Sequence, residues 1–119
     1  NSKDKYFLLK VYKKNNKYLL VKNRNFNFLK NFNIFPMQEL IRPKNFNQNL
    51  NFKMSNMNMN IKIKNDKMIK PIPFSYWIDP KKLKNYTLPS FTKKIIKYLE
   101  NTQIKLKFIL NSWDESIED

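Results

Sequence analysis

Hydrophobic and polar residues alternate along one central stretch of the chain, residues 53–64. Met57, Met59, Ile61 and Ile63 occupy every second position, with asparagine or lysine between them. Successive side chains of a β-strand point to opposite faces of a sheet, so a period of two predicts one buried face and one face in water. We therefore expect a half-buried strand here.

Other short apolar segments predict further strands. They are residues 6–12, 17–22, 75–78 and 103–110, the last with alternating Ile104, Leu106, Phe108 and Leu110. Asn15 and Asn16 lie between the first two segments. Asparagine tolerates the positive φ of a tight turn better than other residues with a side chain, so these two segments are expected to form a β-hairpin.

The clearest helix is expected to begin near Ser90, a suitable N-cap residue. Its apolar positions recur every three or four residues, which places them on one helical face. They are Phe91, Ile95, Ile96 and Leu99. With one helical turn expected over residues 81–85, the chain is predicted to be an α+β domain with a mixed or antiparallel sheet and one clear C-terminal helix.

Composition limits the chemistry that the chain can perform. Its 119 residues suffice for one domain with a modest core, and we expect a monomer. There is no cysteine and no histidine, which excludes disulfides and cysteine-bound metals and removes the commonest general base. The chain begins at Asn1, so we interpret it as a fragment of a longer protein, and with no apolar run of about 20 residues we expect no membrane association and a cytoplasmic location.

The net charge of +15 favours a nucleic-acid partner, because lysines that neutralise phosphates release counterions. Residues 1–110 hold 24 basic and five acidic residues, a balance of +19, whereas residues 111–119 hold four acids and no base. We therefore predict a single basic domain over 1–110 and an acidic tail over 111–119. The richness in Lys, Asn and Ile is also typical of an AT-rich coding sequence, so the charge is supporting evidence only.

Four segments carry a more specific signal. Residues 7–11 and 18–24 form the expected hairpin and end in Lys-Asn-Arg; residues 29–36 end in Phe-Pro; residues 54–59 read Met-Ser-Asn-Met-Asn-Met; and residues 77–90 run from Trp77 to Ser90 through Leu-Pro. In this order they resemble the C-terminal domain of the MutY family of adenine DNA glycosylases. The corresponding family patterns are a Nudix-like opening hairpin with R-x-R, G-L-W-E-F-P, F-[ST]-H-F-x-L and W-x-x-x-x-[DE]-L-x-x-[YL]-x-[LF]-P.

The resemblance covers most of residues 6–99 and departs from the family at two places. Few residues separate the Phe-Pro pair from Met54, so the helix that Nudix-like domains usually place there is expected to be reduced or absent. Asn56 and Met54 stand where the family has a histidine and an aromatic residue. The resemblance implies a Nudix-like fold, a bacterial base excision repair protein associated with the nucleoid, and a role in recognising 8-oxoguanine opposite adenine in double-stranded DNA.

The resemblance also implies that this chain has no catalytic residue and no cofactor of its own. The glycosylase chemistry and an iron–sulfur cluster would belong to a separate N-terminal domain of the same protein. By the family pattern, Ser55 contacts the lesion, with Asn56, Met54 and Met57 beside it. We expect four nearby cations to hold phosphates, namely Lys53, Arg24, Lys22 and Lys30.

Two other functions compete with this one. A Nudix hydrolase needs several clustered carboxylates for Mg²⁺, but Glu39 is the one acid between residues 36 and 56, so an active hydrolase is disfavoured. A generic basic nucleic-acid-binding protein is the second alternative. Residues 103–108 also resemble the Q-x-x-L-x-F peptide that binds bacterial sliding clamps, although their alternation already explains them as a strand.

Overall fold

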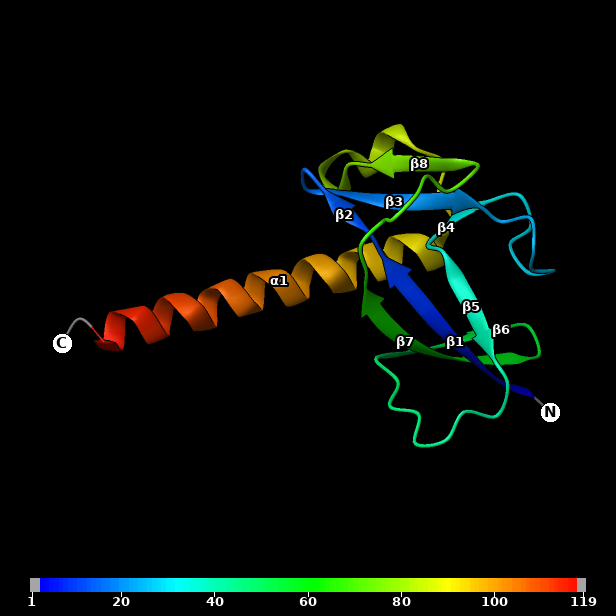
Figure 1. Ribbon diagram of the computed structural model, residues 1–119, viewed down its shortest axis with the longest axis horizontal. Helices are drawn as coiled ribbons and strands as arrows, with labels where there is room; N and C mark the ends of the chain where they lie inside the picture. Colours follow the sequence, from blue (N-terminus) through cyan, green and yellow to red (C-terminus); the bar gives the residue numbers. More distant parts are fainter. Residues whose placement is uncertain (1–2, 118–119) are drawn as a thin grey trace.

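The computed structural model describes the backbone of residues 3–117 and the side chains of residues 3–106, 109 and 110. Two β-sheets and one long C-terminal helix make up the domain (Figure 1). The elements are β1 (Lys3–Val11), β2 (Lys13–Lys14), β3 (Lys17–Lys22), β4 (Asn33–Ile34), β5 (Met37–Leu40), β6 (Leu50–Met54), β7 (Met57–Asn65), β8 (Ser75–Ile78), the short 3₁₀ helix η1 (Pro80–Asn85) and α1 (Ser90–Ile117).

The first sheet has the strand order β5-β1-β7-β6 and is mixed. β1 runs parallel to β7, with Phe7 opposite Ile61, while β5 and β6 are antiparallel to their neighbours. Phe7, Leu9 and Met59 are buried, and the intervening side chains of β1 are more exposed, which is the alternation expected of a half-buried sheet.

The second sheet has the order β2-β3-β4, and β8 pairs with β3. Asn15 and Asn16 have φ values of 51° and 62°, the pair of positive angles that a type I′ hairpin turn requires. The turn prediction is confirmed, but only Lys13–Lys14 pairs with β3 across it. Most of the first predicted arm is β1, which belongs to the other sheet.

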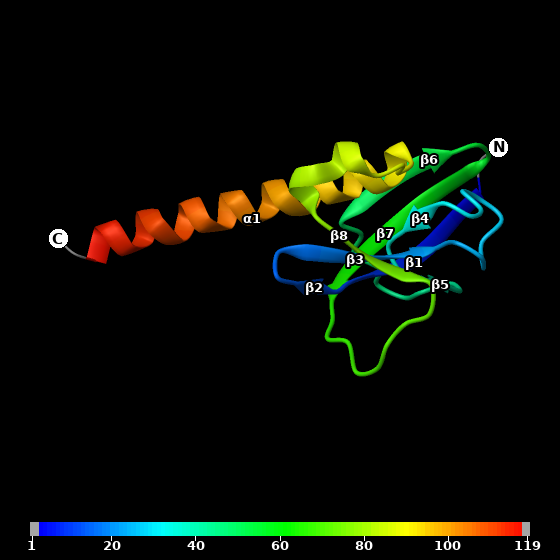
Figure 2. The ribbon, with the colours of Figure 1, turned by 90° about the horizontal axis from the view of Figure 1, so that it is seen from above.

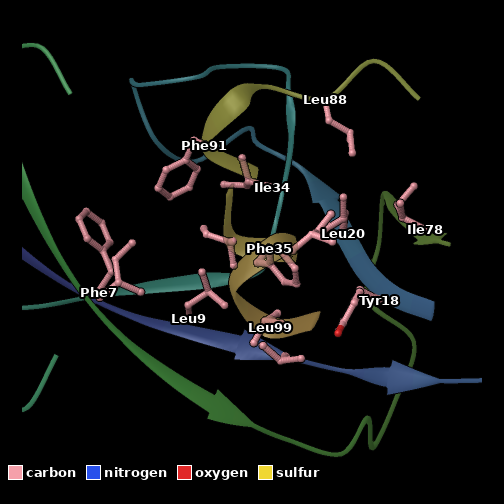
Figure 3. Packing of buried hydrophobic residues seen from close by; sticks show 14 of the residues in the cluster. Phe7, Leu9, Tyr18, Leu20, Ile34, Phe35, Ile78, Leu88, Phe91 and Leu99 are labelled. Carbon is pink, nitrogen blue, oxygen red and sulfur yellow. The ribbon is translucent and has the colours of Figure 1, made fainter. Parts of the chain in front are cut away.

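The first half of α1 packs on both sheets, and its second half projects away from them (Figures 1 and 2). Figure 3 shows Phe7 and Leu9 pointing toward the same interior space as Phe91 and Leu99 of the helix. The predicted apolar face is confirmed, because all four of its residues belong to the core. The N-terminal turn is tied down by buried Thr92, whose Oγ1 donates a hydrogen bond of 2.8 Å to the carbonyl oxygen of Asn33.

Tyr18 joins β3 to the middle of α1. Its hydroxyl donates a hydrogen bond of 2.6 Å to Oε2 of Glu100, and the ring is fully buried. Gln103 lies beside this pair and accepts a hydrogen bond of 2.5 Å from Nζ of Lys13. Burial raises the pKa of the Tyr18 hydroxyl well above its usual value, and the hydrogen bond to the Glu100 carboxylate raises it further.

The prediction of a strand over residues 103–110 is wrong, because α1 continues through this segment to Ile117. Adding residues to an existing helix is far easier than starting a new element, and no proline or glycine interrupts the chain after Ser90. The acidic segment 111–119 stays a prediction. Residues 111–117 are helical in backbone, and residues 118 and 119 lie outside the described part.

The predicted strand over residues 53–64 is two strands of a hairpin. β6 ends at Met54, a turn follows at Ser55 and Asn56, and β7 begins at Met57. The period of two lies wholly within β7, from Met57 to Ile63, and Met54 is out of phase with it because the turn intervenes. Residues 41–49, between β5 and β6, contain no helix, so the expected loss of the usual Nudix helix is confirmed.

Candidate nucleic-acid interface

The β6–β7 turn presents the polar segment that the sequence analysis selected. Ser55 and Asn56 are exposed at its tip. Ser55 has a φ of 54°, and Asn56 does not have a positive φ, a pattern found in type II′ turns. A residue with a β-carbon adopts such an angle at a cost, so surrounding structure must hold the turn in place.

The start of β1 and the helix supply that support. The backbone N–H of Lys3 donates a hydrogen bond of 2.8 Å to the carbonyl oxygen of Asn56, which fixes the turn against the parallel strand. Half-buried Met54 and Met57 pack against the core below the tip. Phe52 of β6 contacts Phe91 of α1 edge to face, with ring centroids 5.0 Å apart. The hydroxyl of Ser55 is thus carried on a well-braced hairpin.

The loop of residues 23–33 lies at the same end of the molecule as the β6–β7 turn in both ribbon views (Figures 1 and 2). Its conformation depends on buried Asn23. The side-chain amide of Asn23 donates to the carbonyl oxygens of Phe28 and Leu29, at 2.5 and 3.1 Å, and its Oδ1 accepts from the N–H of Phe26 at 3.0 Å. Phe26 and Phe28 stack on each other and meet Phe7 edge to face. The loop is therefore pinned to the core.

A pocket of about 400 Å³ opens beside this loop. Lys22, Arg24 and Phe26 contribute to it from β3 and the loop, and Phe74 closes it from the segment before β8. The guanidinium carbon of Arg24 lies 4.0 Å from the centroid of the Phe74 ring, a cation–π contact. Its lining residues include no acid, so the pocket is basic with aromatic walls, which suits phosphate and nucleobase groups.

The structure gathers the predicted site residues into two groups at this end. Lys53, Met54, Ser55, Asn56 and Met57 form the hairpin tip. Lys22 and Arg24 line the pocket, and Lys30 is exposed on the neighbouring loop.

Asn23, Phe26 and Phe74 also belong to this region, although they were not among the residues predicted from the sequence. An asparagine directly after a strand is a known loop-stabilising signal and marks Asn23. Nothing in the sequence places Phe74 next to Arg24, because the two residues are distant along the chain and meet only through the pairing of β8 with β3.

The described residues do not form the cluster of carboxylates that a Nudix hydrolase needs to hold Mg²⁺. Glu39 lies near the end of β5 and forms an ion pair of 3.9 Å with Lys5, both side chains being partly exposed. In the described part of the chain, no group of three or more histidine, cysteine, aspartate or glutamate residues is placed to hold a metal ion. A search of the same residues finds no helix long and apolar enough to cross a membrane.

The fold has a solved counterpart. It is the C-terminal domain of mouse MUTYH, determined in complex with human PCNA, which superimposes with a TM-score of 0.59 over 85% of this chain and 90% of that chain. The two chains share 14% sequence identity, so the likeness concerns the fold. No protein-family model and no curated protein matches the sequence.

The chain has a MUTYH-like C-terminal fold. The expected fold class is confirmed: a Nudix-like α+β domain with two sheets, one C-terminal helix and no helix between β5 and β6.

Proposed function

We propose that this chain is the lesion-reading domain of an adenine DNA glycosylase, and that it recognises 8-oxoguanine opposite adenine. The observation that carries the proposal is the position of Ser55, exposed at the tip of a braced turn in a MUTYH-like C-terminal fold. The basic pocket and loop at the same end support it, because a reader must also hold the phosphates that flank the lesion.

The chemistry of the lesion explains why a hydroxyl suits the task. Guanine presents N7 and O6 as acceptors in the major groove. In 8-oxoguanine N7 carries a hydrogen and becomes a donor, while the oxygen on C8 is a new acceptor. The Ser55 Oγ accepts from N7–H, and a backbone N–H of the turn donates to the oxygen on C8. Met54 and Met57 are soft, apolar neighbours that can pack beside a base pair.

Flanking groups have a positioning role in this proposal. Lys53, Lys22, Arg24 and Lys30 bind phosphates, and Asn56 makes a neutral polar contact where the family has histidine. The chain itself is non-catalytic. The glycosylase residues and the iron–sulfur cluster belong to an N-terminal domain of the same protein, and the present domain positions that domain on the mismatch.

Replacement of Ser55 tests the reader directly. The measurement is affinity for two duplexes that differ only in 8-oxoguanine or guanine opposite adenine, across a series of salt concentrations. Ser55→Ala is expected to lower the preference for the lesion by about 1–2 kcal/mol, the range for one lost hydrogen bond, with little change in binding to the guanine duplex. Ser55→Gly is expected to lose the same preference while stabilising the fold, because glycine accepts a positive φ without strain.

Thr87→Ala is the matched control, since it removes an exposed hydroxyl from the segment before α1. Equal affinity of the wild-type chain for both duplexes at every salt concentration would contradict lesion reading. That result would favour the generic basic nucleic-acid-binding protein.

A sliding clamp is a second candidate partner, because the mouse MUTYH domain was determined with PCNA and residues 103–108 match a clamp-binding pattern. The local structure weighs against it. The Gln103 side chain already bonds to Lys13 and lies near the Tyr18 hydroxyl, and the segment is helical. Clamp binding therefore requires these contacts to be given up.

A further inference from the structure

The apolar stripe that anchors α1 in the core continues along its projecting half. Ile95 and Leu99 are buried against the sheets. Leu106, Ile109 and Leu110 follow at spacings of seven, ten and eleven residues from Leu99, so they lie on the same side of the helix. Their exposed fractions are 56%, 62% and 52%. A stripe that is buried in the first half is therefore uncovered in the second.

A helical segment of this kind needs a partner. Isolated helices shorter than about 12–15 residues are marginal in water, and most helices in proteins are stabilised by packing of an apolar face. The projecting half of α1 extends from the body in both ribbon views (Figures 1 and 2). In the described part of the chain, neither sheet reaches it there, so the surface that covers it lies outside the described residues.

The charge pattern of the helix favours a second copy of the chain as the partner. Exposed Lys97 and Lys105 flank the beginning of the projecting half. Near its end, α1 carries Asp114 and Glu115 and no base after residue 113. In an antiparallel pair of identical helices, the basic beginning of one lies beside the acidic end of the other, whereas a parallel pair places like charges together.

We propose that the projecting half of α1 pairs antiparallel with the same segment of a second copy of this chain. Such an interface is isologous and closes as a two-fold dimer. It places the two strongly basic bodies at opposite ends of the helix pair, which limits their repulsion. The β6–β7 turns, at the far end of each body from the helix, stay uncovered (Figure 1). The proposal replaces the expectation of a monomer and does not depend on the proposed function.

Two exposed isoleucines on one helix provide a matched test. Ile109 belongs to the stripe, while Ile104, 65% exposed, lies about 140° around the helix from it. In sedimentation equilibrium, the wild-type mass should rise from one chain to two with concentration. Ile109→Glu is expected to weaken dimerisation by more than about tenfold, and Ile104→Glu should resemble the wild type. Circular dichroism and thermal unfolding check that both variants fold.

Two results would overturn the proposal. One is a monomeric mass at all concentrations, which would leave the stripe for a different partner. The other is equal weakening by the two isoleucine variants, which would place the contact elsewhere.

Orientation is tested by a single cysteine, because the native chain has none. Thr102 is exposed and lies on the side of the stripe. In an antiparallel pair the two copies of residue 102 are at opposite ends, so Thr102→Cys is expected to form no disulfide under oxidising conditions. Rapid dimer formation by disulfide would show a parallel pair and contradict the proposal.

Discussion

At the residue scale, asparagine occupies turn positions with a positive φ, where most proteins have glycine. The chain has no glycine, and four of its positive-φ positions are asparagines, namely Asn15, Asn16, Asn31 and Asn45. A left-handed conformation costs most residues about 1–2 kcal/mol, and the short polar side chain of asparagine reduces this cost by local hydrogen bonding. Another asparagine, Asn23, acts through its side chain, because its three hydrogen bonds hold the loop that follows β3.

Asn23→Ala is expected to lower the free energy of unfolding by about 2–3 kcal/mol, because it removes three hydrogen bonds and leaves the carbonyl oxygen of Phe28 and the N–H of Phe26 without this partner, while the carbonyl oxygen of Leu29 keeps the N–H of Phe32. Urea denaturation measures the loss. Asn27→Ala, at an exposed position of the same loop, is the control and should change the stability by less than about 0.5 kcal/mol. Similar losses for both variants would show that the loop is not held by Asn23.

At the scale of elements, the sequence predicts which segments form strands or helices better than it predicts which strands pair. β3 and β8 have the predicted bounds, and the apolar face of α1 is the predicted one. In these segments the spacing of the apolar residues is regular, and turn residues mark where each segment ends. The parallel pairing of β1 with β7 left no local signal, since it joins residues more than 50 positions apart. The same holds for the approach of Phe74 to Arg24.

Two errors at this scale have a common cause. Residues 103–110 alternate, yet Leu106, Ile109 and Leu110 also satisfy a helical spacing, and the preceding helix decides between the two. The alternation of residues 57–63 lies within β7, and the turn before it contains neither glycine nor proline to mark the boundary with β6. In both cases the alternation alone did not determine the type or the bounds of the element. Of the candidate site, the sequence predicts the hairpin cluster and the two pocket cations Lys22 and Arg24, but not the aromatic walls of the pocket.

The tie between β3 and α1 predicts a pH dependence. The raised pKa of Tyr18 means that the protonated hydroxyl is favoured in the folded state. Its contribution is full below about pH 10, the usual tyrosine pKa, and is lost as the pH rises through the higher folded value. Tyr18→Phe should therefore cost about 1–2 kcal/mol at pH 7, and its difference from the wild type should shrink above pH 10.

Urea unfolding from pH 7 to pH 11 measures this difference, in which the titration of the other groups cancels. Tyr76→Phe, which removes an exposed hydroxyl, serves as the control. A Tyr18→Phe difference that stays constant to pH 11 would contradict the assigned role of burial and of Glu100.

The molecule as a whole has two ends with different surfaces. The hairpin tip, the loop and the basic pocket occupy one end, and the uncovered helix extends from the other (Figure 2). The net charge of +15 makes binding to any nucleic acid depend on salt, so affinity alone does not locate the interface. The interface is located by comparing variants, because the slope of log affinity against log salt concentration reports the number of phosphate contacts.

Lys53→Ala is expected to reduce the slope of log affinity against log salt concentration by about 1, as one lost phosphate contact requires. Lys84→Ala, at an exposed position of η1 and away from the proposed interface, should leave the slope nearly unchanged. Titration of a labelled duplex at several salt concentrations gives both values. An equal drop for the two variants would mean that the lysines act only through total charge.

The hydrogen bond between Lys3 and Asn56 has a practical meaning for labelling. It holds the start of β1 against the β6–β7 turn, so a fluorophore attached at exposed Lys3 would lie within reach of whatever the turn contacts. A dye in that position would act as a proximity reporter for the tip. A bulky label at Lys3 would shield the tip instead and should be omitted when affinity is measured.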